Sequence, residues 1–233
     1  MKIVYFLRSL LFYCGYAPLT IFFGLMATFL WLLPRPLAQR VTVSWNGIVL
    51  WWLGISCGVH YKISGGDNLP KNCVIASNHQ SPWETIFLQY HFFPVASVLK
   101  KELLNIPFFG WGLRIMDPIA IDRSKPAQAV KQIKQLGKAR LENGYSVMIF
   151  PEGTRMPVGQ VGEFKRSAAD IAKNAAVPLL PLYQNSGQYW PNKQFIKKPG
   201  TIEVVIGEPI DLSDLNTKEV IAEVQVWMEK QQN

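Results

Sequence analysis

Residues 78–84 read Asn-His-Gln-Ser-Pro-Trp-Glu and mark the passage from a strand to a helix. The four residues before them, 74–77, are apolar and typical of a short buried strand. Ser81 is a suitable N-cap and a proline follows it, as at many helix starts. Residues five apart on a continuous helix point about 140° away from each other. His79 and Glu84 can therefore meet only because the turn lies between them, and we predict a base–acid pair there.

The same stretch also fits a purely structural role. Ser81 and Glu84 form a capping-box pattern, in which the glutamate side chain returns to the N-cap amide. That role accounts for both residues without any catalysis. It does not account for His79, one of three histidines in the chain. Catalytic groups gather on loops at the carboxyl ends of strands in open α/β sheets, so both roles stay open on these residues alone.

A second strand exit lies at residues 150–155, which read Phe-Pro-Glu-Gly-Thr-Arg. The β-prone run at 145–150 predicts the strand that leads into it. Arg155 presents a fixed fork of donors that suits a phosphate group, and Gly153 lets backbone amides approach an anion. A surface ion pair between Glu152 and Arg155 in an ordinary turn explains the stretch equally well.

Four blocks in this order resemble the glycerophospholipid acyltransferase family, in particular its bacterial 1-acylglycerol-3-phosphate (lysophosphatidate) acyltransferases. The blocks are residues 78–84, Ile121-Asp122-Arg123, residues 150–155 and Val177-Pro178-Leu179-Leu180-Pro181-Leu182. The resemblance covers residues 60 to 210. Two departures are visible: Glu84 stands where the family pattern has aspartate, and Ser167 stands where relatives usually carry glycine. The longer arm of Glu84 either still holds the imidazole or serves mainly as a cap.

The resemblance implies an enzyme that moves a fatty acyl group onto the free hydroxyl of 1-acyl-sn-glycerol-3-phosphate, giving phosphatidic acid. The donor is expected to be acyl-CoA or acyl carrier protein (acyl-ACP), a co-substrate, with no cofactor and no metal. We expect His79 to act as general base and Glu84 to fix its tautomer. The residues expected to bind the substrate are Lys100, Arg123, Glu152, Gly153, Thr154 and Arg155. Of these, Lys100, Arg123 and Arg155 are candidates to hold the acceptor phosphate, and Glu152 and Gly153 shape that pocket; Lys165 is a further candidate for phosphate or CoA.

Other functions remain open at this point. One is acylation of a different lysophospholipid or of a lyso-aminolipid head group. Another is binding to a lipid surface without catalysis. The net charge of +8 invites a nucleic-acid-binding interpretation, but such a protein has no need of sixty largely apolar residues at one end. The three widely spaced cysteines indicate neither a disulfide framework nor a zinc site.

The first sixty residues predict attachment to a membrane. No Asp or Glu precedes Asp67, and residues 10–33 and 41–61 contain no Asp, Glu, Lys or Arg. Either stretch reaches the ~20 residues that cross a bilayer. A spanning hairpin would place Arg35 and Arg40 opposite the catalytic domain, against the preference of such loops for the cytoplasm. We therefore favour two monotopic helices on the cytoplasmic face of the bacterial inner membrane, in contact with the phospholipid bilayer.

The remaining pattern predicts an α/β fold with a central mixed sheet flanked by helices. We divide the chain into a membrane-associated helical segment, residues 1–62, and an acyltransferase catalytic domain, residues 63–233. Further expected strands are 177–183 and 201–206, and expected helices are 126–143, 163–174 and 217–230. The inward faces are expected to carry Val130, Ile133, Leu136 and Leu141 in one helix and Val220, Ile221, Val224, Trp227 and Met228 in another. Residues 103–112, with Phe108, Phe109 and Trp111, either line the route of the acyl chain or pack in the core.

Overall fold

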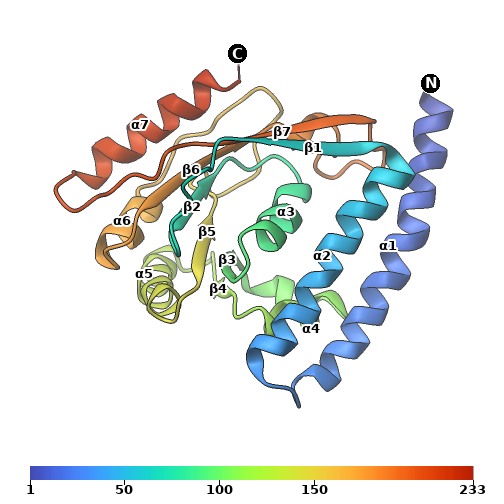
Figure 1. Ribbon diagram of the computed structural model, residues 1–233, viewed down its shortest axis with the longest axis horizontal. Coiled ribbons are helices and arrows are strands. Elements are labelled where there is room, and N and C mark those ends of the chain that lie inside the picture. The colour runs from blue at the N-terminus through green and yellow to red at the C-terminus, as the bar shows by residue number, and fades with distance from the viewer. Residues whose placement is uncertain (233) are drawn as a thin grey trace.

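The computed structural model, which describes residues 1–232, places two long N-terminal helices beside an α/β unit (Figure 1). Helix α1 spans Lys2–Leu30 and α2 spans Arg35–Cys57, and the two pack along each other. Helix α2 ends at Gly58, whose left-handed backbone is a common helix stop. Their order and length match the predicted two-helix segment.

Seven strands form one sheet in the order β1-β7-β6-β2-β5-β3-β4. The strands are β1 (Val59–Ser64), β2 (Val74–Ser77), β3 (Val95–Lys100), β4 (Ile119–Ile121), β5 (Ser146–Ile149), β6 (Leu179–Gln184) and β7 (Gly200–Ile206). Among the strand pairs within residues 1–232, only β6–β7 is antiparallel, so the prediction of a mixed sheet is confirmed. Because β2, β5 and β6 run parallel, their carboxyl ends meet at one edge, where ligands bind in such sheets.

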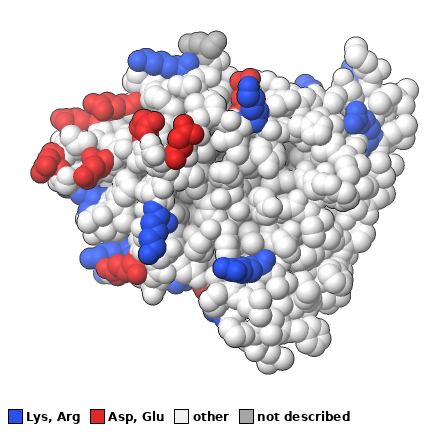
Figure 2. All heavy atoms as spheres, in the orientation of Figure 1, with Lys and Arg blue, Asp and Glu red and all other residues white. Residues whose placement is uncertain are grey.

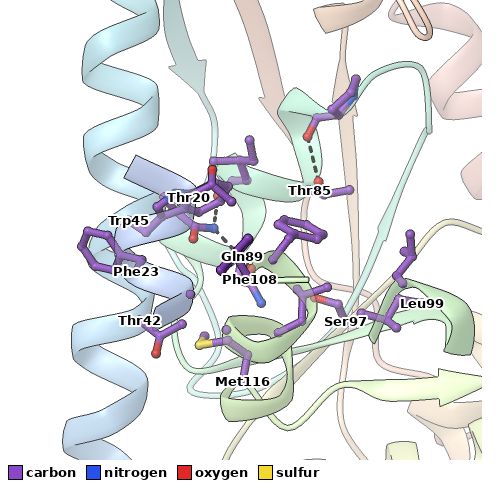
Figure 3. Close-up of a pocket in the computed structure, with 18 of the residues that line it drawn as sticks. Thr20, Phe23, Thr42, Trp45, Thr85, Gln89, Ser97, Leu99, Phe108 and Met116 are labelled. Carbon is purple, nitrogen blue, oxygen red and sulfur yellow. Dashed lines mark hydrogen bonds between the residues drawn. The ribbon is translucent and has the colours of Figure 1, made fainter. Parts of the chain in front are cut away.

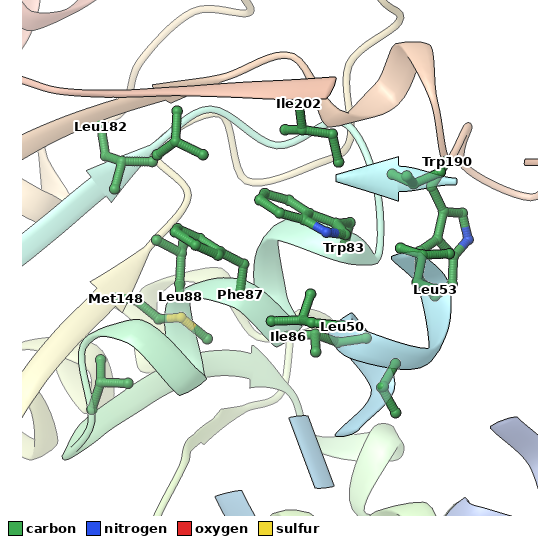
Figure 4. Close-up of a cluster of buried hydrophobic side chains, with 14 of the residues drawn as sticks. Leu50, Leu53, Trp83, Ile86, Phe87, Leu88, Met148, Leu182, Trp190 and Ile202 are labelled. Atoms are coloured by element: carbon green, nitrogen blue, oxygen red, sulfur yellow. The ribbon is translucent and has the colours of Figure 1, made fainter. Parts of the chain in front are cut away.

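Helices cover both faces of the sheet. They are α3 (Trp83–His91), α4 (Phe109–Ile115), α5 (Pro126–Glu142), α6 (Ser167–Asn174) and α7 (Thr217–Lys230), with short 3-10 turns at Lys101–Asn105 and Ser186–Gln188. Successive side chains of β2 point to opposite faces of the sheet. Ile75 packs in a cluster with α1, α2 and α3, whereas Val74 and Ala76 pack in a cluster with α5, α6 and α7. Figure 4 shows the first of these clusters, where Trp83 and Phe87 of α3 lie between α2 and the sheet.

The structure corrects two details of the expected helices. The helix predicted from residue 163 begins at Ser167, because the backbone N–H of Phe164 donates to Gln225 and that of Lys165 donates to Pro151. In α5, Val130 and Leu136 are exposed, so the predicted inward face is wrong at these two positions. The buried stripe consists of Ala129, Ile133, Gly137 and Leu141. Small side chains let α6 approach closely, since a Cβ at Gly137 would lie 3.0 Å from Ile171.

Helix α7 follows the prediction more closely. Val220, Ile221, Val224 and Met228 are buried. Trp227 is half-buried and lies against Gly207, where an added Cβ would approach its ring to 3.0 Å. The inward face of α7 is therefore the one that the sequence indicated.

The α1–α2 pair is fastened to the sheet domain near its loop as well as along its length. Asp117 accepts hydrogen bonds from Arg35 at 2.5 and 3.0 Å, from Gln39 at 2.8 Å and from Tyr145 at 3.2 Å. Burial alone would raise the pKa of Asp117, but Arg35 and Arg140 outweigh it and lower that pKa. The first turn of α2 is therefore tied to the sheet domain, while residues 31–34 between the two helices stay exposed. The predicted boundary after residue 62 falls within β1, which pairs with β7.

The outward surface of the helix pair is apolar. Among residues 1–232, α1 is the one helix long and apolar enough to cross a membrane, with a mean hydropathy of 1.7. Figure 2 shows that charged side chains gather over the sheet and its outer helices, whereas the side formed by α1 and α2 is almost free of them. The exposed apolar side chains there include Phe6, Leu10, Phe22, Phe29, Trp31 and Trp51. This surface is suited to contact with lipid.

Candidate active site

His79 and Glu84 meet at the carboxyl end of β2, as the sequence predicts. The Nδ1 atom of His79 lies 2.6 Å from Oε1 of Glu84. The glutamate side chain is fully buried, while the histidine side chain keeps 12% of its surface exposed. With Nδ1–H donated to the carboxylate, Nε2 is the nitrogen left to accept a proton, and within residues 1–232 it has no hydrogen-bond partner.

Glu84 is a helix cap and the partner of His79 at the same time. Its Oε1 also accepts the backbone N–H groups of Gln80 at 3.0 Å and Ser81 at 2.9 Å, and Oε2 accepts the Ser186 hydroxyl at 2.8 Å. A buried carboxylate is costly unless its oxygens are hydrogen-bonded, and these contacts satisfy both oxygens. The capping role and the imidazole-holding role are therefore not alternatives, because one carboxylate does both.

Two further contacts hold His79 in place, one to its ring and one to its backbone. Its ring stacks on Phe150, with centroids 4.0 Å apart and planes at 16°. Its backbone carbonyl accepts the N–H of Met156 at 2.8 Å. The loop after β5 thus fixes the residue that follows β2, which joins the two strand exits predicted from the sequence into one site.

Glu152 stabilises the backbone of this site. Its carboxylate accepts the backbone N–H of His79 at 2.7 Å and that of Gly162 at 3.3 Å. Burial raises the pKa of Glu152 to about 7, and the charge of Glu84 adds to the rise, although the two N–H donors oppose it. The sequence predicted that Glu152 helps to shape the acceptor pocket, and that role stays a prediction. In the structure its carboxylate binds backbone N–H groups and so sets the position of His79.

Three cationic side chains surround the loop at Gly153. Arg123 Nη1 donates to the carbonyl of Gly153 at 2.8 Å, and a Cβ built on Gly153 would lie 3.2 Å from Lys165 Nζ. Burial lowers the pKa of Arg155; the charge of Arg123 lowers it further and that of Glu84 raises it, so these charges lie near one another. Arg155 donates to Asn192 at a long 3.4 Å. The arrangement leaves guanidinium donors free for an anion beside His79.

Lys100 and Thr154 are less directly placed. Lys100 ends β3, is half exposed and pairs with Glu102 at 3.3 Å. Within residues 1–232 it makes no hydrogen bond or ion pair to the residues around Gly153. Thr154 is exposed in the loop itself. The structure therefore brings together His79, Glu84, Arg123, Gly153 and Arg155, with Lys165 beside them.

An apolar cavity of about 200 Å³ lies between the N-terminal helices and α4, and Figure 3 shows part of its wall. Phe150, on which the imidazole of His79 stacks, and Arg155 both line it. Of the predicted acyl route, Leu103, Phe108, Phe109 and Gly112 line the cavity, whereas Trp111 packs against Phe108. Other lining residues include Tyr16, Thr20, Phe23, Gly24, Thr42, Trp45, Thr85, Ile86, Gln89, Leu99, Met116 and Met148.

The cavity wall contains a strained turn. Phe108 has φ 63° and ψ −59°, and the N–H of Phe109 donates to Pro107 at 2.7 Å, which makes a γ-turn of the rare positive-φ type. Helix α1 passes directly over this turn at Gly24, where a Cβ would lie 2.4 Å from Phe108 Cα. Only a glycine fits at this crossing.

Two polar contacts of the site were not anticipated from the sequence. Ser186 and Asn192 both follow β6, whose carboxyl end lies beside that of β2. Residues 185–192 carry several polar side chains directly after a predicted strand, which is a usable signal. The order of elements along the chain does not, however, show that β6 lies next to β2 in the sheet.

Comparisons with known proteins show the family of the chain. A family model described as Acyltransferase matches residues 60–184. A Pseudomonas aeruginosa protein named 1-acyl-sn-glycerol-3-phosphate acyltransferase is 46% identical over 210 residues, covering 89% of this chain and 82% of its own. A Saccharomyces cerevisiae protein of the same name is 29% identical over 229 residues, covering 95% of this chain and 74% of its own.

A solved structure is similar over nearly the whole chain. It is the crystal structure of the 1-acyl-sn-glycerophosphate (LPA) acyltransferase PlsC from Thermotoga maritima, with a TM-score of 0.82 and 26% sequence identity. The match covers 99% of this chain and 95% of that one. The similarity therefore includes the N-terminal helices as well as the sheet.

Proposed function

The chain belongs to the acyltransferase family, and we propose that it transfers a fatty acyl group from an acyl thioester to the free hydroxyl of 1-acyl-sn-glycerol-3-phosphate, giving phosphatidic acid. One observation carries the proposal. His79, paired with Glu84, stacks on Phe150, and Phe150 lines an apolar cavity together with the cationic Arg155. Such a site suits a substrate with a phosphate at one end and an acyl chain at the other.

The chemistry follows from the contacts of the imidazole. His79 Nε2 takes the proton of the acceptor hydroxyl as that oxygen attacks the thioester carbonyl. Glu84 holds Nδ1–H and stabilises the imidazolium that forms, as the acid does in a Ser-His-Asp triad. Collapse of the tetrahedral intermediate forms the ester and breaks the C–S bond. The departing thiolate takes the proton back from Nε2, so the acceptor supplies the nucleophile and no enzyme serine is acylated.

The two ends of the substrates are assigned by charge and polarity. Arg123, Arg155 and Lys165 are the groups for the acceptor phosphate, since guanidinium forks pair well with phosphate oxygens. The cavity next to Phe150 is the site for an acyl chain, because burying apolar surface there gains roughly 25 cal/mol per Å². Acyl-CoA and acyl-ACP both remain donors in this proposal, and neither a metal nor an organic cofactor takes part.

We further propose that the enzyme lies on one face of the membrane, the cytoplasmic face of the bacterial inner membrane. The ion pair of Arg35 with Asp117 supports this, because it ties the first residue of α2 to the segment between α4 and β4. The contact of Arg8 Nε with the Ser56 carbonyl, 3.0 Å, holds the other end of the pair. A hairpin crossing the bilayer would have to break the first contact and move its loop to the opposite side.

The test is a panel of lysolipids with acyl-CoA and acyl-ACP donors, using release of the donor thiol as the signal. The His79→Ala variant should lose about 10²–10⁴-fold in rate while its unfolding temperature stays unchanged. The exposed His60 of β1 provides a matched control, and His60→Ala should retain full activity.

Four outcomes of this experiment are informative. Preference for lysophosphatidate supports the proposal, and preference for another lysolipid points to the alternative head group. A folded His79→Ala protein with full activity would show that the imidazole is not the base. If no acceptor in the panel leads to thiol release, the result would favour a lipid-surface binding protein without catalysis.

A further inference from the structure

Within residues 1–232, the fully buried side chain of Ser186 makes one hydrogen bond. Its hydroxyl donates to Oε2 of Glu84 at 2.8 Å, and both residues have 0% relative exposure. The two are 102 positions apart in the chain. The contact therefore joins the segment after β6 to the first turn of α3.

The surrounding backbone holds Ser186 at this point. Its N–H donates to Gln184 Oε1 at 2.7 Å, and its carbonyl accepts the N–H of Trp190 at 2.9 Å. Gln184 is in turn bonded to Asn78, with contacts of 2.8, 3.0 and 3.1 Å. At Gly187 an added Cβ would lie 2.9 Å from the Cβ of Gln80. A glycine thus lets the segment approach the turn that carries His79.

The two oxygens of Glu84 have different tasks. Oε1 receives His79 Nδ1 and two backbone N–H groups, while Oε2 has the Ser186 hydroxyl. A glutamate has one more rotatable bond than an aspartate, and the broad torsion at its carboxyl group has no strong intrinsic preference. A donor on Oε2 fixes that torsion and so keeps Oε1 in line with the imidazole.

We propose that Ser186 is a positioning residue that acts on His79 through Glu84 and makes a glutamate effective at this place. The proposal rests on the acyl transfer assigned above. Ser186 touches no substrate in this scheme. Its removal leaves a buried carboxylate oxygen without a partner and lets the carboxylate rotate away from Nδ1.

The kinetic test uses the full-length protein in detergent. Ser186→Ala should lower kcat by about tenfold, the loss expected for one hydrogen bond to a charged group, with the KM values nearly unchanged. Ser186→Cys fills the same space with a weak donor and should fall between wild type and Ser186→Ala. Ser146 is the matched control: it is buried at the opposite end of β5 and its Oγ accepts the Cys73 N–H, so Ser146→Ala should keep the wild-type kcat.

A double-mutant comparison tests whether Ser186 works through Glu84. The shorter arm of Glu84→Asp cannot reach both His79 and Ser186, so in that background Ser186→Ala should cost about twofold or less. An equal loss in both backgrounds overturns the proposal. A loss that appears in KM rather than kcat also overturns it, because that result indicates direct contact with a substrate.

A spectroscopic measurement separates this proposal from the choice of substrate. The resonance of the His79 Nδ1 proton reports the hydrogen bond to Glu84 and needs no turnover. It should shift in Ser186→Ala and stay in place in Ser146→Ala, even if the lysolipid panel fails to find the acceptor. An unchanged resonance in Ser186→Ala would show that Ser186 does not position the pair.

Discussion

The crossing of α1 over the Phe108 turn gives a prediction with a built-in control. Gly24 and Gly112 are both helical glycines that line the same cavity. A methyl group at Gly24 would lie 2.4 Å from the backbone Cα of Phe108, whereas at Gly112 the nearest atom is Thr42 Cγ2 at 3.8 Å. Backbone atoms, unlike the end of a flexible side chain, cannot rotate away from a new methyl group. The substitution of either glycine by alanine therefore has the same chemistry and opposite steric consequences.

The expected magnitudes differ accordingly. Replacing a helical glycine by alanine gains roughly 0.5–1 kcal/mol of helix stability at either site. Overpacking costs about 1–3 kcal/mol, and only Gly24→Ala incurs it. Gly112→Ala should thus be slightly stabilising, and the free energy of unfolding of Gly24→Ala should be lower than that of Gly112→Ala by about 1–3 kcal/mol.

Thermal unfolding in detergent, followed by tryptophan fluorescence, measures the difference. At about 2–4 °C per kcal/mol for a chain of this size, the two variants should differ in Tm by roughly 2–12 °C. Equal Tm shifts in the two variants would refute the reasoning, because they would mean that α1 does not press on the Phe108 turn.

Three further predictions concern the site and its supports. Arg155→Ala should raise the KM for lysophosphatidate about tenfold or more with a smaller change in kcat, whereas Arg166→Ala, which removes an exposed arginine paired with Asp170, should leave both unchanged in steady-state assays. Because the pKa of Glu152 is raised from 4.5 to about 7, the folded state binds more protons than the unfolded state between these values. The free energy of unfolding should therefore fall as pH rises from 5 to 8, and Glu152→Gln should flatten this dependence in denaturant titrations at the two pH values. Asp117→Asn should lower the free energy of unfolding by about 1–3 kcal/mol, through weaker hydrogen bonds to Arg35; a variant as stable as wild type would show that this contact contributes little.

Local patterns predicted the elements of the fold well. The strand before His79, the Ser81–Glu84 turn and the helix at 217–230 all follow from apolar spacing and capping residues. The inward face of α5 was predicted in part wrongly, because the buried stripe contains Ala129 and Gly137. Small residues give a weak apolar signal, although a close helix–helix contact needs them. Burial at such places depends on the neighbouring helix, which the local sequence does not describe.

The site divides in the same way. The pairing of His79 with Glu84 was predictable because five residues and one turn separate them. The contact of Ser186 with Glu84 joins residues 102 positions apart and depends on β6 lying next to β2. Glu152 shows the complementary case: a motif indicated that the residue matters, but only the structure shows that it binds backbone N–H groups.

The walls of the cavity have a practical consequence for work on this enzyme. Tyr16, Phe23 and Trp45 come from the first sixty residues, and Phe109, Met148 and Phe150 come from the rest of the chain. Truncation of the two N-terminal helices to obtain a water-soluble protein would remove one wall of the cavity and expose its apolar lining to water. The N-terminal helices are thus part of the substrate cavity as well as a membrane attachment. Purification is best designed for the full-length protein in detergent from the first step.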